Sequence, residues 1–190
     1  VGFIVLVVVF QQEIRRFLLV LGSGNFSAKK MGRFFRFVRA EKKEPRTNIG
    51  ALVEACEKLS MQRLGALIVI ERNDSLDFVK NSGDAMDITL NAPIIESIFY
   101  KNSPLHDGAA IIKGNKIIAT RVILPVSNAK DIPAQYGLRH KAAIGITENT
   151  DAICLVVSEE RGEISYIKEK NFVSFDSIVM LKEKIKRDLA

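Results

Sequence analysis

Cysteine is scarce in this sequence, and its two copies lie far apart. Cys56 and Cys154 are the only cysteines in 190 residues, and neither belongs to a CxxC pair or a histidine-rich stretch. One lies in a helix-like segment and the other in a strand-like apolar run, which is typical of small buried residues with reduced thiols. The sequence therefore argues against a structural zinc site and against a fold held by disulfides.

A hydrophobic run long enough to cross a membrane is also missing. Residues 1–10, VGFIVLVVVF, are apolar, but ten helical residues rise only about 15 Å, half of a hydrocarbon core of about 30 Å. A signal peptide is not indicated, because no positive charge precedes the run and no small-residue cleavage site follows it. Since the chain opens on Val1 rather than Met, we interpret residues 1–22 as the end of a transmembrane or juxtamembrane helix. A buried amphipathic helix is the alternative.

Basic residues are concentrated in residues 23–46. The chain has 28 Lys and Arg against 22 Asp and Glu, a formal net charge of +6 that suits polyanionic ligands. We interpret this segment as a basic connector that lies on anionic lipid at the cytoplasmic face of the cell membrane. A solvated helix face is the second interpretation, and binding of single-stranded nucleic acid is the least favoured. The basic side chains are Lys29, Lys30, Arg33, Arg36, Arg39, Lys42, Lys43 and Arg46.

Residues 47–190 are predicted to form one globular domain, because 47% hydrophobic content suffices for one good-sized core. Residues 72–87 are a predicted loop with room for a helical turn or short strand, and 126–137 are a second loop. Apolar residues at helical spacing predict helices over 48–61, 92–100, 141–147 and 175–186. Apolar runs predict strands over 65–71, 152–158 and 164–168. Two further apolar runs predict a hairpin with its loop at Lys113–Lys116. We therefore expect an α/β fold: a single domain with a central mixed β-sheet flanked by helices, preceded by the N-terminal membrane-proximal helix.

A carboxylate and an imidazole stand together where a predicted strand begins. His106 and Asp107 precede Gly108 and Ala109, whose small side chains let a ligand approach the backbone. An Asp beside an imidazole can hold a divalent ion near a phosphate. A turn Asp that bonds to backbone amides is the alternative reading of the same residues.

Two further polar segments complete the candidate chemistry. Arg139, His140 and Lys141 stand where a helix is predicted to start, which makes an anion site, with a solvated basic turn as the alternative. Ser158 is followed by Glu159 and Glu160 at the end of a buried strand, where carboxylates can hold a metal or receive a proton; ordinary loop chemistry is the alternative. Together the three segments predict a metal-assisted phosphate site but do not specify a reaction.

The spacing of these segments resembles a known family. NSPLHDGAAII at 102–112, followed by LRHKAAIGITENTDAICLVVSEERGEIS at 138–165, is similar to the diadenylate cyclase domain with its DGA and RHR motifs. The similarity covers about residues 48–168, and the apolar start and basic connector resemble the membrane-anchored bacterial branch. The resemblance implies that 47–190 is a catalytic domain on the cytoplasmic side of the membrane. It also implies that two ATP molecules condense into cyclic di-AMP and two pyrophosphates at a site shared by two face-to-face domains of a homodimer, with no nucleic acid partner.

The resemblance also implies roles for individual residues. Asp107 would bind Mg²⁺ or Mn²⁺, with other divalent ions open, and activate the 3′-hydroxyl. The other metal ligands would be His106 and Glu160, and the catalytic set would be Asp107, Gly108, Arg139 and His140. The ATP-binding set would be Gly108, Ala109, Leu124, Arg139, His140, Lys141 and Ser158.

Three positions depart from the family pattern. Leu138 stands where a threonine is common, Lys141 where the motif has its second arginine, and Ile123 where many relatives place an aromatic residue against adenine. Lys141 offers a point charge instead of a bidentate guanidinium, so the phosphate contacts are expected to differ from the family pattern. With Ile123 in place of an aromatic residue, base binding is expected to rely on aliphatic contacts and on the backbone around Leu124. Two other functions remain open: a nucleotide-binding sensor without catalysis, and a membrane-attached interaction module.

Overall fold

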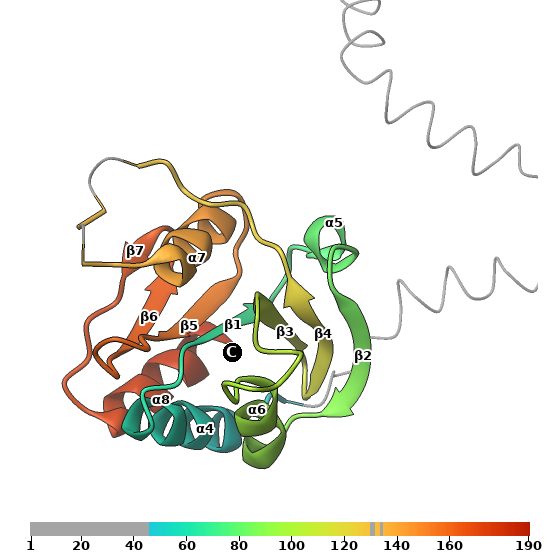
Figure 1. Cartoon of the computed structure of the whole chain (residues 1–190). Helices are drawn as coiled ribbons and strands as arrows, with labels where there is room; N and C mark the ends of the chain where they lie inside the picture. Colours follow the sequence, from blue (N-terminus) through green and yellow to red (C-terminus); the bar gives the residue numbers. More distant parts are fainter. Residues whose placement is uncertain (1–45, 130–131, 134) are drawn as a thin grey trace, which may run out of the picture. The chain divides into compact units, whose positions relative to one another are not determined.

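The computed structural model describes residues 46–129, 132–133 and 135–190 (Figure 1). These residues belong to one compact unit, Glu44–Ala190. The predictions for residues 1–22 and for the connector up to Pro45 lie outside the described residues. Within the part that the structure describes, no helix has the length and apolar character needed to cross a membrane.

The described residues form one seven-stranded mixed sheet (Figure 1), which confirms the predicted fold class. Its strand order is β2-β4-β3-β1-β5-β6-β7. Only the central β1 and β3 run parallel, and the other neighbouring pairs are antiparallel. The strands are β1 (Ala66–Glu71), β2 (Asp84–Thr89), β3 (Ala109–Lys113), β4 (Lys116–Val122), β5 (Ile153–Val157), β6 (Ile164–Lys168) and β7 (Asn171–Phe172).

Helices cover both faces of this sheet (Figure 1). One core is formed by α4 (Ile49–Met61), α6 (Ala92–Ile98) and α8 (Ile178–Asp188) against one face, and a second core by α5 (Asp77–Lys80) and α7 (Leu138–Asn149) against the other. All six residues of β1 are buried, because Ile68 enters the first core and Val69 the second. A strand buried on both faces leaves its ends as the places where polar groups can meet a ligand.

Helix starts follow local capping chemistry. The Asn48 side-chain oxygen accepts a hydrogen bond from Ala51 N at 3.0 Å, and Asn91 accepts one from Ile94 N at 3.0 Å. Asn48 is therefore the cap of α4, because an N-cap oxygen satisfies one of the amides that open a helix. Cys56 and Cys154 are buried free thiols, as predicted, and burial raises the pKa of the Cys56 thiol to about 12.

Two helix starts differ by three residues from the sequence predictions, and one strand was not predicted. Helix α7 begins at Leu138 rather than 141, so Arg139 and His140 lie in its first turn, and α8 begins three residues later than predicted, after its cap Ser177. The short strand β7 was not predicted. Within α7, Gly145 permits close packing against the preceding loop: a Cβ there would lie 2.9 Å from Ser127 N and against the Pro125 carbonyl.

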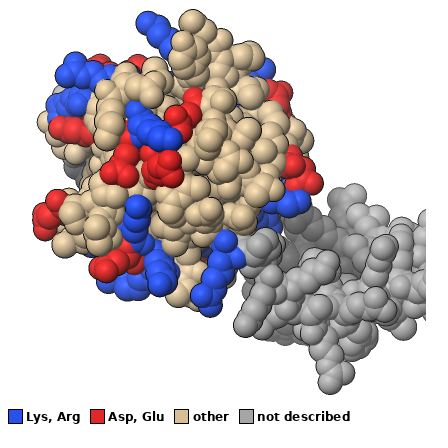
Figure 2. All heavy atoms as spheres, turned by 90° about the horizontal axis from the view of Figure 1, so that it is seen from below, with Lys and Arg blue, Asp and Glu red and all other residues tan. Residues whose placement is uncertain are grey.

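The charge of the chain is unevenly distributed. Nine Lys and Arg residues and three Asp and Glu residues precede Arg46, and this excess equals the net charge of +6 of the whole chain. Residues 46–190 are therefore balanced in charge. Figure 2 shows basic and acidic side chains interspersed on the face seen from below. Among the ion pairs of the domain, Lys58 pairs with Glu54 and Glu96 at 3.0 and 3.1 Å. Any anion site in this domain must come from local placement of cations, since no overall excess exists.

Candidate active site

The strand register brings three of the predicted segments to one edge of the sheet. Ile68 of β1 pairs with Ala110 of β3 in parallel, so Gly65 and Asp107, which precede these two strands, lie at the same end of this ladder. Ala66 pairs with Val157 of β5 in antiparallel, so one step further places Gly65 beside Ser158. Since neighbouring strands lie about 4.8 Å apart, β3 and β5 are separated by roughly 10 Å across β1. A triphosphate can span this distance.

The DGA turn is held in place by close packing of Gly108. Its φ is +97°, a conformation that side chains with a Cβ rarely adopt. A Cβ there would lie 2.8 Å from Arg121 C and 2.9 Å from Val122 O, so the turn rests on the backbone of β4. Arg121 itself has a φ of +57°, in a region where the β3–β4 register shifts. The left-handed Arg121 and Gly108 together direct Asp107 outward from the start of β3.

His106 and Asp107 present two electron-pair donors side by side. Asp107 is exposed, and its Oδ1 lies 3.4 Å from His106 Nε2. His106 Nδ1 lies 2.6 Å from the Ser103 carbonyl oxygen. Because a carbonyl only accepts, Nδ1 carries the proton of this bond, and Nε2 is the ring atom that faces Asp107.

Arg139 lies over Gly65, between the Asp107 and Ser158 segments. Its Nη1 donates to Glu159 Oε2 at 3.0 Å, and 24% of its side chain remains exposed. A Cβ on Gly65 would lie 2.6 Å from Arg139 Nη1 and 2.8 Å from Glu159 Oε2, so only a glycine leaves room for this ion pair. The first turn of α7 therefore does bring a cation to the sheet edge, as predicted for Arg139.

His140 takes a different direction from Arg139. Its ring is buried, contacts Tyr136 and Phe172 with centroids 4.8 and 6.2 Å away, and its Nε2 lies 3.2 Å from Ser165 Oγ. Burial lowers the pKa of His140 to about 4. The imidazole is therefore neutral at pH 7 and ties α7 to β6 and β7. Arg139 and His140, whose side chains were expected to contribute to one anion site, contact different partners in this structure.

The remaining predicted residues lie near the same edge. Ala109 and Leu124 are buried at the start of β3 and after β4, and Lys141 is half-buried in the first turn of α7. Ser158 Oγ accepts from Arg161 N at 3.3 Å, in the turn that carries the exposed Glu160. The two departing positions Ile123 and Leu138 are exposed hydrophobic side chains, at 72% and 74%.

Three acidic or imidazole ligands do not come together here. Among residues 46–129, 132–133 and 135–190, no group of three His, Cys, Asp or Glu side chains is arranged to hold a metal ion. Of the three predicted metal ligands, His106 and Asp107 thus lie next to each other, whereas Glu160 lies in a separate turn. Nucleotide-bound Mg²⁺ needs only one or two carboxylates, because phosphate oxygens and water supply the other ligands.

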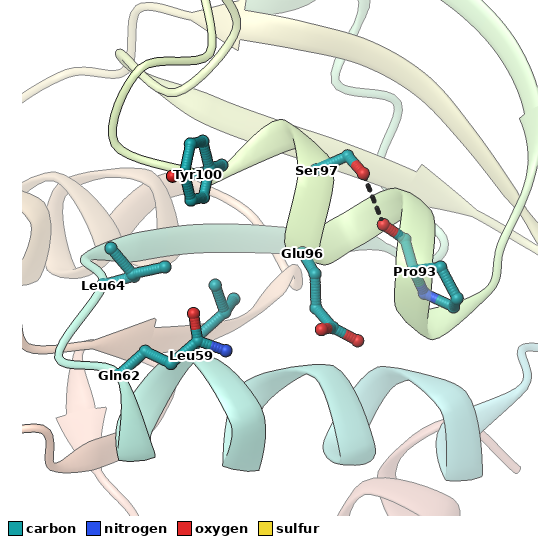
Figure 3. A pocket seen from close by; sticks show the side chains of 7 residues that line it. All are labelled: Leu59, Gln62, Leu64, Pro93, Glu96, Ser97 and Tyr100. Atoms are coloured by element: carbon teal, nitrogen blue, oxygen red, sulfur yellow. Dashed lines mark hydrogen bonds between the residues drawn. The ribbon is translucent and has the colours of Figure 1, made fainter.

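A hollow lies on the face of the sheet that α4 and α6 cover (Figure 3). It has a volume of about 310 Å³ between α4 and α6. Ser97 Oγ donates to the Pro93 carbonyl at 2.8 Å at its rim. None of the predicted site residues lines it; its lining residues are Leu59, Gln62, Leu64, Pro93, Glu96, Ser97 and Tyr100.

The fold is an α/β domain with a mixed sheet, and its candidate site residues gather at one end of that sheet. A family model for the DAC domain, described as DisA bacterial checkpoint controller nucleotide-binding, matches residues 53–172. The chain belongs to this diadenylate cyclase family, which confirms the resemblance found in the sequence.

Individual relatives agree with this assignment. The chain is 37% identical over 167 residues to the diadenylate cyclase of Listeria monocytogenes, covering 88% of this chain and 59% of the relative. It is therefore shorter than the curated relatives it matches and spans about 59% of that one's length. Among solved structures, a double mutant of DacA from Staphylococcus aureus matches with a TM-score of 0.72 at 36% identity, covering 74% of this chain and 94% of that one. A protein from Bacillus cereus named a hypothetical membrane spanning protein matches with a TM-score of 0.65 at 32% identity, over 89% and 80% of the two chains.

Two residues of the site were not predicted in their present roles. Gly65 was assigned only to a strand, and Glu159 was considered for a metal or a proton rather than for Arg139. The contacts of Gly65 and Glu159 with Arg139 have no signal in the sequence. They depend on the register of β1 against β5 and on where α7 begins. A glycine directly before a buried strand is the one cue that a close approach was needed.

The buried neutral His140 predicts a pH dependence of stability. Its folded pKa of about 4 lies below the ordinary value of 6.5, so the unfolded chain binds more protons between these two values. The free energy of unfolding should therefore fall as the pH drops from 6.5 toward 4, with His140 accounting for on the order of 1 kcal/mol between pH 7 and 5. Urea unfolding at the two pH values measures this loss.

His140→Gln should reduce that pH-dependent loss, whereas His106→Gln, which changes the more exposed histidine, should leave it unchanged. An equal loss in wild type and His140→Gln would show that the buried ring does not carry the effect.

Proposed function

We propose that this domain is a diadenylate cyclase, a nucleotidyltransferase that condenses two ATP molecules into cyclic di-AMP and two pyrophosphates. The observation that carries the proposal is the alignment of Asp107, the Arg139–Glu159 pair and Ser158 along one sheet edge. Family membership supports the same reaction, because the relative from Listeria monocytogenes carries the name diadenylate cyclase.

The proposed reaction is a nucleotidyl transfer repeated twice. The 3′-hydroxyl oxygen of one ATP forms a bond to the α-phosphorus of the other, the bond from that phosphorus to the bridging β-phosphate oxygen breaks, and pyrophosphate leaves. The hydroxyl proton passes to the Asp107 carboxylate, which is exposed and free to reach a ribose. In-line positioning and neutralisation of charge carry most of such a transfer, so cations and a fixed base are the parts needed.

The triphosphate is proposed to lie along the edge between Asp107 and Ser158. Arg139 supplies guanidinium donors, Lys141 a further positive charge, and Ser158 a hydroxyl. His140 is neutral here, so its proposed contribution is to hold the first turn of α7 through Ser165, Tyr136 and Phe172. The grip on phosphate then depends on Arg139 more than on a basic triplet.

The donor set beside the triphosphate fits a divalent cation. His106 Nε2 and Asp107 Oδ1 lie 3.4 Å apart as two electron-pair donors, and the Ser103 carbonyl orients the ring as a backbone oxygen commonly does for a metal-binding histidine. We propose that these two residues, with Glu160 as a further ligand, would hold Mg²⁺ or Mn²⁺. Such an ion supplies Lewis-acid neutralisation of phosphate charge and lowers the pKa of a bound hydroxyl.

The base is proposed to bind without an aromatic platform. Gly108 and Ala109 leave the backbone accessible, while the buried Leu124 and the exposed Ile123 offer aliphatic surface beside them. Aliphatic contacts discriminate bases less than directed hydrogen bonds, so selectivity for adenine would rest on backbone groups around Leu124.

Ring closure requires a second copy of the chain. Each sheet edge carries one Asp107 and one phosphate-binding set, whereas the reaction joins two nucleotides through two reciprocal attacks. We therefore propose that two domains face each other as a homodimer, each holding one ATP. A catalytically inactive nucleotide-binding sensor is the alternative function, and it would bind ATP without forming product.

Membrane attachment is proposed through residues 1–46, with the domain on the cytoplasmic side. The apolar start and the concentration of the net charge before Arg46 support this proposal. One structural relative carries the name of a membrane spanning protein. An interaction module attached to the membrane is the alternative that shares these features.

Asp107→Asn should reduce cyclic di-AMP formation from ATP and Mn²⁺ by at least about a hundredfold, because a proton-accepting carboxylate is lost. Mass spectrometry of the products measures this. The variant should unfold at the wild-type temperature, since the Asp107 side chain is 85% exposed. Asp87→Asn, another exposed ion-pairing aspartate on β2, is the matched control and should be fully active. Full activity of Asp107→Asn would refute the assigned role, and ATP binding without product by wild type would favour the sensor.

Specific activity should rise with protein concentration, because each subunit supplies half of the reaction centre. Initial rates of product formation across a dilution series, beside the mass from analytical ultracentrifugation, test this. A rate per molecule that stays constant while the protein dissociates into monomers would contradict a shared site.

The full chain should sediment with vesicles that contain anionic phosphatidylserine. Replacing Lys29, Lys30, Arg33 and Arg36 by Gln should weaken this binding, at roughly 1 kcal/mol per charge near the surface. Lys80→Gln, Lys101→Gln, Lys116→Gln and Lys168→Gln together form a control of equal charge change in the described domain. Equal loss of binding in both variants would contradict a specific role for the connector.

A further inference from the structure

The Arg139 guanidinium is confined by two residues that the proposed chemistry does not use. Glu159 Oε2 accepts from Nη1 at 3.0 Å, and a Cβ on Gly65 would lie 2.6 Å from the same nitrogen and 3.0 Å from Cζ. The guanidinium thus occupies the space where a side chain at Gly65 would lie, and Gly65 precedes β1 at the end of the sheet that also carries Asp107 and Ser158. The confinement places the cation in the middle of the edge.

We propose that Glu159 and Gly65 are positioning residues that set the Arg139 guanidinium for the triphosphate. This inference rests on the proposed function and adds how its main cation is placed. Glu159 draws the guanidinium toward β5, and the missing side chain at Gly65 lets it settle against the sheet. Neither residue needs to touch the nucleotide.

A free arginine at this edge would be a poor phosphate ligand. An Arg side chain has about 2 kcal/mol of rotamer entropy to lose when it is immobilised. Glu159 immobilises it before the nucleotide arrives, so less of the binding free energy is spent on ordering. Because the recorded bond uses Nη1 alone, the guanidinium keeps other N–H donors for phosphate oxygens.

The direction of the change in ATP affinity when Glu159 is replaced distinguishes a positioning role from a purely electrostatic one. Glu159 is an acidic group next to a site for a polyanion, and its removal on charge grounds alone would tighten ATP binding. If the carboxylate competed with phosphate for Arg139, removal would also tighten binding. Positioning predicts the opposite, a weaker complex.

The first test replaces Glu159 in the full chain. Glu159→Ala should raise the KM and the Kd for ATP about tenfold or more, while kcat changes less, because misplacing a binding group by an ångström has effects of this size. Glu159→Gln keeps an acceptor oxygen and should recover most of the affinity. Glu54→Gln removes an acid from another 3.0 Å ion pair, with Lys58 on α4, and should leave all values unchanged.

The second test leaves Glu159 in place and moves the cation instead. Gly65→Ala puts a Cβ against the ends of two side chains rather than against backbone, so the fold should persist with an unchanged urea midpoint. Its KM and Kd for ATP should rise as in Glu159→Ala. In an Arg139→Ala background, Glu159→Ala and Gly65→Ala should no longer change the KM or the Kd for ATP, because both act through that guanidinium.

Several results would overturn the inference. These are tighter ATP binding in Glu159→Ala, unchanged binding in Gly65→Ala, or effects of either substitution that persist without Arg139. Calorimetric ATP binding separates this inference from the proposed function: a wild type that forms no cyclic product refutes the function, while the response of ATP affinity to the three residues still decides the positioning.

Discussion

The register of three neighbouring strands is the constraint on which this molecule depends. β1 pairs with β3 in parallel and with β5 in antiparallel, and these two pairings bring Asp107, Gly65 and Ser158 to the same end of the sheet. A shift of one residue in either pairing would turn every side chain of a strand to the other face and separate the three. The two cores prevent such a shift, because β1 contributes buried residues to both.

Burial on both faces also decides where the polar chemistry lies. The opposite end of β1 is occupied by Glu71, whose buried carboxylate pairs with Lys113 and accepts from Leu76 N at 3.0 Å. At the Gly65 end the polar groups are more open: Asp107 is exposed, and Arg139 keeps a quarter of its surface free. Glycines adapt this end to a ligand, since Gly108 packs the turn on β4 and Gly65 accommodates the guanidinium.

Most helices and strands, and the segments that carry the candidate site, could be predicted from the sequence. Helices and strands follow the period of the hydrophobic residues, and caps such as Asn48 follow local hydrogen bonding. It was insufficient where tertiary packing decides. Helix α7 begins at Leu138 rather than at residue 141, and His140 packs against Tyr136 and Phe172 instead of lying beside Arg139. The pairing of Arg139 with Glu159 across Gly65 depends on strand register and helix position together, and no local pattern encodes both. The family could be assigned from the spacing of the motifs, because this spacing does not depend on where α7 begins or on the direction of a single side chain.

A crystal structure of the protein with a non-hydrolysable ATP analogue and Mn²⁺ tests the central claim most directly. The account predicts that the triphosphate lies along the edge between Asp107 and Ser158 with Arg139 on its oxygens, and that the metal density touches His106 Nε2 and Asp107. Triphosphate density at another place, such as the hollow between α4 and α6, with Asp107 turned away from both nucleotide and metal, would contradict it.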